Sequence, residues 1–79
     1  MIYQGDIVKI GGIDVLCVED IDFQGKHFLY FVGIKDKKMF FGEENEGKIR
    51  VVNNKEEKIV LKDEFQKKIG DEIPFKEAK

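Results

Sequence analysis

Short runs of β-branched and aromatic residues, separated by turn residues, occupy most of this chain. The Gly11-Gly12 dipeptide supplies the positive φ angles of a tight hairpin turn. Gly25 and the Asn53-Asn54 pair give similar signals, because Gly and Asn adopt left-handed backbone conformations at little cost. This punctuation favours short antiparallel strands joined by tight turns.

Five or six strands are expected from this pattern. Residues 27–34 form the most apolar run, which is too short for a typical helix and is therefore predicted to be a central strand. Residues 13–23 predict a long strand with a β-bulge near Glu19. The other predicted strands are short and cover residues 6–10, 39–41, 48–52 and 58–62.

The spacing of apolar residues changes near the C-terminal end of the sequence. Leu61, Phe65 and Ile69 recur four residues apart, and this predicts a short helix over residues 62–69. Residues 71–79 are expected to form a frayed tail of the same single domain, residues 1–79.

The predicted strands form an antiparallel meander that curls into a small barrel, because closure removes exposed strand edges. The opening Gly-Asp-Ile-Val-Lys-Ile of residues 5–10, then a turn and a long strand, resembles the first strands of SH3-like barrels. The resemblance covers residues 5–41 and implies binding of proline-rich peptides, RNA, DNA or partner subunits. Peptide-binding SH3 domains use a tryptophan that this chain lacks, so recognition of proline-rich peptides is not expected.

Composition excludes several classes of function. A chain of 79 residues buries only about 60 to 65% of its unfolded surface, which leaves little room for a large active-site cavity. The 14 basic and 16 acidic residues nearly cancel, so no strong field attracts nucleic acid or membrane. The chain contains no Ser and no Thr, which removes hydroxyl nucleophiles. Its bias toward Lys over Arg, with a single Ala, is typical of proteins from low-GC bacteria or their phages.

The chain has one cysteine, Cys17, and one histidine, His27. A lone cysteine forms no intramolecular disulfide, and the sequence has neither a signal peptide nor an apolar run of about 18 residues. We therefore expect a cytoplasmic protein with no membrane association. Cys17 lies in an apolar run and is predicted to be a buried, inert thiol, while His27 is expected at a solvated strand end.

Two segments imitate known ligand-binding loops. Residues 42–48 have the spacing of a phosphate-binding loop, but three glutamates fill the cradle and Ile49 replaces the hydroxyl that holds magnesium. An acidic loop is expected there instead. Residues 20–25 begin like a calcium-binding EF-hand loop, yet Phe31 stands where a bidentate carboxylate is required. No metal or cofactor is therefore predicted, with weak cation binding at a solvated tip of Glu19, Asp20 and Asp22 kept as an alternative.

The leading functional hypothesis is a non-enzymatic accessory or protein–protein interaction module. Residues 28–34 carry bulky apolar side chains on both faces of the predicted strand, and a helix of about eight residues, about 12 Å long, cannot cover one whole face. The uncovered row would bind another protein or a second copy of the chain, as in a homodimer. The predicted contact residues are Phe28, Val32 and, at the centre, Tyr30.

Two alternatives remain open. The first is binding of single-stranded nucleic acid by a basic and aromatic surface within residues 35–50, although interleaved acidic residues weaken the release of counterions. The second is an enzyme built on a Cys17–His27 nucleophile pair. The residues predicted for the nucleic-acid surface are Lys35, Lys37, Lys38, Lys48 and Arg50, together with Tyr30.

Overall fold

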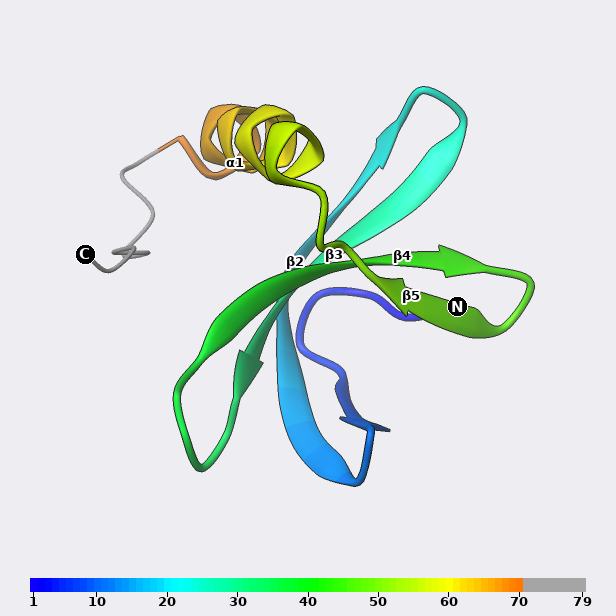
Figure 1. Ribbon diagram of the computed structural model, residues 1–79, viewed down its shortest axis with the longest axis vertical. Coiled ribbons are helices and arrows are strands. Elements are labelled where there is room, and N and C mark those ends of the chain that lie inside the picture. Colours follow the sequence, from blue (N-terminus) through cyan, green and yellow to red (C-terminus); the bar gives the residue numbers. More distant parts are fainter. Residues whose placement is uncertain (71–79) are drawn as a thin grey trace.

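The computed structural model describes residues 1–70 as a five-stranded antiparallel sheet followed by one helix (Figure 1). The strands pair in chain order, which confirms the predicted mainly β meander with a single C-terminal helix. The expected frayed tail, residues 71–79, lies outside the described residues. The elements are β1 (Ile7–Ile10), β2 (Ile13–Phe23), β3 (Lys26–Gly33), β4 (Met39–Asn45), β5 (Lys48–Val51) and α1 (Lys55–Ile69).

The sheet curls into a half-barrel whose first and last strands do not pair with each other (Figure 1). Positive φ angles at both Gly11 and Gly12 close the β1–β2 hairpin, as predicted, and fit the right-handed twist of the flanking strands. The predicted β-bulge is also present, because the register between β2 and β3 shifts between Cys17 and Glu19. Twist and bulge together give the sheet its curvature.

Two apolar clusters cover the two faces of the sheet, and β3 contributes alternate residues to both. This arrangement explains why β3 is apolar along most of its length and confirms that it is the central strand. The cluster under α1 consists of Ile21, Phe28, Tyr30, Phe41, Val52, Leu61 and Phe65. The cluster on the concave face consists of Val15, Cys17, Leu29 and Phe31.

The predicted strand over residues 58–62 is wrong, because these residues belong to α1. The helix begins where the Asn54 side chain caps it by accepting a hydrogen bond from the Glu57 N–H at 2.9 Å. Acidic residues in its first turn and basic residues in its last turn interact favourably with the helix dipole and stabilise the helix. The helix therefore has 15 residues, almost twice the expected length, and ends at the left-handed Gly70.

The expected acidic loop over residues 42–47 is also wrong for most of its length, since β4 continues to Asn45. Glu43 lies opposite Arg50 in β5, and its carboxylate accepts a hydrogen bond from the Arg50 Nε at 3.0 Å. This pairing allows a nearly buried carboxylate to stand inside a strand. Only Glu46 and Gly47 form the turn, both with positive φ.

Truncation of Phe65 tests how much the sheet depends on α1. Phe65 is fully buried, so Phe65→Ala is expected to lower the free energy of unfolding by about 3 to 5 kcal/mol, measured by urea denaturation. The control is Gln66→Ala, which changes an exposed neighbour on the same helix and should cost less than about 0.5 kcal/mol. Equal effects of the two substitutions would show that α1 does not hold the sheet.

Candidate functional site

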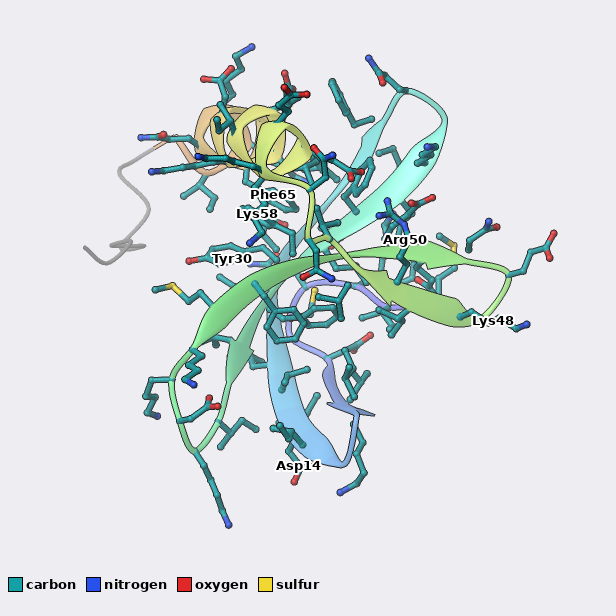
Figure 2. The ribbon with its side chains drawn as sticks, in the orientation of Figure 1. Asp14, Tyr30, Lys48, Arg50, Lys58 and Phe65 are labelled. Atoms are coloured by element: carbon teal, nitrogen blue, oxygen red, sulfur yellow. The ribbon has the colours of Figure 1, made fainter. Side chains whose placement is uncertain are left out.

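Tyr30 lies in the core between the sheet and α1 (Figure 2). It is 2% exposed and Phe28 is 3% exposed, whereas Val32 is half-buried. The Tyr30 ring packs against Phe65 with 5.8 Å between ring centroids, and its hydroxyl donates to the Met39 Sδ at 3.0 Å. The expectation of an exposed apolar row is therefore wrong for Tyr30 and Phe28.

The length of α1 explains this correction. A helix of 15 residues is about 22 Å long, so it covers more of the sheet than a helix of about eight residues would. Leu61 and Phe65 are its buried residues and lie in the same cluster as Phe28 and Tyr30. Two of the three residues that were predicted to bind a partner are thus covered by the chain itself.

The five basic residues predicted to bind nucleic acid do not form one patch. Lys35, Lys37 and Lys38 lie in the turn between β3 and β4, whereas Lys48 and Arg50 lie on β5 (Figure 2). Lys38 lies just before β4, and Lys48 lies just after the turn that follows β4. The length of this strand, about 20 Å, therefore separates the two lysines.

Arg50 has a structural role as the link between β4, β5 and the start of α1. Its Nε donates to Glu43, and its Nη2 donates to the Glu57 Oε2 at 2.9 Å. The hydrogen bonds from Glu57 and Glu43 raise the pKa of the guanidinium further, although burial opposes the rise. Arg50 is therefore engaged by two carboxylates of its own chain.

Cys17 is buried, as predicted, and its thiol donates to the Glu19 carbonyl at 3.3 Å. Burial raises the pKa of Cys17 to about 12, and the negative charges of Asp20 and Asp6 add to the rise. A thiol in this environment has almost no thiolate at neutral pH, and the thiolate is the nucleophilic form.

His27 is buried rather than solvated, which corrects the expectation for this residue. Its Nδ1 lies 2.8 Å from the Asp22 Oδ1, and its Nε2 lies 2.9 Å from the Ile2 carbonyl oxygen. Burial lowers the pKa of His27, but the hydrogen bonds to the Ile2 carbonyl and to Asp22 outweigh it and raise the pKa above its ordinary value. The imidazole therefore fastens the N-terminal segment to β3.

The three acidic residues of the tip that was kept as an alternative cation-binding site have partners within the protein. Asp20 accepts a hydrogen bond from the Gln4 N–H at 2.8 Å, Asp22 faces His27, and Glu19 lies 3.7 Å from the Lys68 Nζ. Within residues 1–70, no group of three or more His, Cys, Asp or Glu side chains is arranged to hold a metal ion.

An open edge of β4 is the feature that sequence reasoning missed. The register between β4 and β5 begins at Gly42, and one further bond joins the Val52 N–H to the Phe41 carbonyl at 2.9 Å. Backbone groups of alternate residues point to the same side of a strand, so those of Met39 point to the same side as those of Phe41, away from β3. Among the described residues, no strand covers this side of Met39.

Two grooves flank this edge. The first, here called the α1 groove, has a volume of about 330 Å³ and is lined by residues 39–41 and by Lys55, Lys58, Ile59 and Lys62 of α1 (Figure 2). Its lining includes three consecutive β4 residues, which places it at the strand edge, because consecutive side chains point to opposite faces. The second, here called the seam groove, has a volume of about 340 Å³ and is lined mainly by Ile10, Ile13, Val15, Phe40 and Val51.

A sequence signal for the α1 groove existed. Lys55, Lys58, Ile59 and Lys62 follow the spacing of one helical face, in which residues three, four and seven apart lie together. This signal is lost when residues 58–62 are interpreted as a strand, because consecutive side chains of a strand, such as Lys58 and Ile59, point to opposite faces. The free edge itself has no local signal, since it depends on where β5 ends.

Comparisons with protein-family models, with curated proteins and with solved structures give no match. No helix among the described residues is both long enough and apolar enough to cross a membrane.

The Cys17 thiol is expected to resist modification in the folded protein. Because the thiolate is scarce and the side chain is buried, Ellman's reagent should react slowly with native protein and rapidly in denaturant. Rapid labelling of native protein at neutral pH would contradict this expectation and would revive the Cys17–His27 pair.

The pKa of His27 predicts a dependence of stability on pH. A group with a raised folded pKa stabilises the fold fully below its unfolded pKa of 6.5 and loses this contribution as the pH rises through the folded value. The thermal midpoint of the wild type, relative to that of His27→Gln, should therefore fall as the pH rises above 6.5. A difference that stays constant as the pH rises above 6.5 would contradict the assignment.

Proposed function

We propose that this protein is a non-enzymatic interaction module that binds an extended segment of another protein along the open edge of β4. The observation that carries the proposal is the Met39 backbone, whose N–H and C=O point to a side of β4 that no described strand covers. An exposed sheet edge pairs readily with an added strand, and this is a common way in which domains bind peptides.

The two grooves support the same proposal. Side chains of an added strand alternate between the two faces of the sheet, and a groove adjoins the edge of β4 on each face. Among the described residues no strand pairs with the outer edges of β1 and β5 either, but the lining of the α1 groove includes residues of β4 and none of those two strands. The edge of β4 thus combines backbone hydrogen bonding with space for side chains.

The resemblance to SH3-like barrels and the expected cytoplasmic location are both compatible with this proposal. Kinship with SH3-like barrels agrees with a binding role, because that architecture serves many kinds of partner. A cytoplasmic setting agrees with a lone buried cysteine. Self-association and nucleic-acid binding are the competing modes of interaction, and each gives a distinct result in the experiment below.

Two matched variants of α1 test the proposal. Ile59 lines the α1 groove and is 62% exposed, whereas Val60 is 44% exposed and lies outside that groove. Protein immobilised from wild type and from Val60→Glu should retain the same partner from an extract of the source cell. Ile59→Glu should lose most of that partner, because it replaces an exposed apolar side chain of the α1 groove with a carboxylate that is costly to bury under a bound segment.

Treatment of the extract with nuclease and light scattering of the pure protein separate the alternatives. The proposal expects retention that nuclease does not change, and pure protein that stays monomeric. Loss of retention after nuclease treatment, or equal retention by Ile59→Glu and Val60→Glu, would overturn it. Self-association that Ile59→Glu abolishes would identify a second copy as the partner.

A further inference from the structure

The α1 groove has a charge that the composition of the chain does not suggest. Its lining includes three lysines, Lys55, Lys58 and Lys62, and no acidic residue. The whole chain has 16 acidic and 14 basic residues, so this groove is a local exception. A ligand that enters it meets positive charge without a compensating carboxylate in the wall.

Most other cationic side chains on the helix and at the open edges have acidic partners. Lys67 bridges to Asp63 and Glu64, and Arg50 and Lys68 are also paired. In contrast, Lys55 and Lys58 form no ion pair within residues 1–70. Their charges are directed at a groove rather than used within the fold.

The seam groove on the other face of β4 has a different character. Its wall is mainly apolar and includes Phe40 and Val51, and its two charged residues, Asp36 and Lys38, are of opposite sign. An extended segment beside Met39 would therefore place alternate side chains in a basic groove and in an apolar groove.

We propose that the segment bound at the edge of β4 is one in which acidic residues alternate with apolar residues. Its carboxylates face Lys55, Lys58 and Lys62, its apolar side chains face Phe40 and Val51, and its backbone pairs with Met39. This inference rests on the proposed function and names the chemistry of the partner.

The aromatic residues of the α1 groove favour an acidic peptide over single-stranded nucleic acid. Binding of single strands requires exposed aromatic faces on which bases stack. Phe41 is 4% exposed, and the half-buried Phe40 packs its ring against Phe31 with 5.3 Å between centroids. The groove thus offers positive charge and a strand edge but no open stacking surface.

Binding of two synthetic peptides to the full chain tests the inference. One peptide alternates Glu with Val, and the other alternates Gln with Val. The Glu peptide should bind about ten-fold more tightly in fluorescence anisotropy, and added salt should reduce this advantage. Hydrogen exchange at the Met39 amide should slow when the Glu peptide binds, because that N–H acquires a strand partner.

Paired lysine substitutions provide a matched control. Lys55→Gln/Lys58→Gln should weaken binding of the Glu peptide about five-fold, since each exposed ion pair contributes little. Lys26→Gln/Lys48→Gln removes the same charge from the exposed first residues of β3 and β5 and should leave binding unchanged.

Three results would overturn the inference. If the Gln peptide binds as tightly as the Glu peptide, the partner is not acidic, although the edge of β4 still binds a strand. If neither peptide binds while the cellular partner remains sensitive to Ile59→Glu, the inference fails and the proposed function stands. If a single-stranded oligonucleotide binds through Lys55 and Lys58 and the peptides do not, the ligand is nucleic acid.

Discussion

The packing of Phe65 against the aromatic row of the sheet is the interaction on which the rest of the structure depends. Its ring stacks on Phe41 with an interplanar angle of 8° and a centroid separation of 5.3 Å, and it also contacts Tyr30. This contact fixes α1 over one face of the sheet and buries apolar side chains that would otherwise face solvent. The position of α1 then decides which side chains are core and which line a groove.

The same packing creates the open edge. After Val52 the chain leaves the sheet to begin α1, so β5 ends before it can cover Met39. Arg50 stabilises the passage from β5 to α1, because its hydrogen bonds to Glu43 and Glu57 join the two strands to the first turn of the helix. A chain that turns from β5 into a helix over the sheet thus leaves the Met39 side of β4 unpaired by any described strand.

Cys17, His27 and Asp20 make contacts that stabilise the fold. Cys17 fills the concave core, and His27 holds the N-terminal segment through the Ile2 carbonyl. Asp20 binds the same segment through the Gln4 N–H. A domain of this size buries less apolar surface than a larger one. Polar side chains that bind the N-terminal segment to the sheet therefore add stability that the small core does not supply.

The sequence by itself determined the β1–β2 hairpin, the bulge and the central strand, because Gly11-Gly12 and the β-branched runs act through local backbone preferences. Tertiary structure alone decided the rest. Residues 58–62 suit a strand or a helix, and only burial of Leu61 and Phe65 against β3 selects the helix. Burial of Tyr30, the open edge at Met39 and the gathering of lysines beside it follow from that choice, since each depends on where α1 lies.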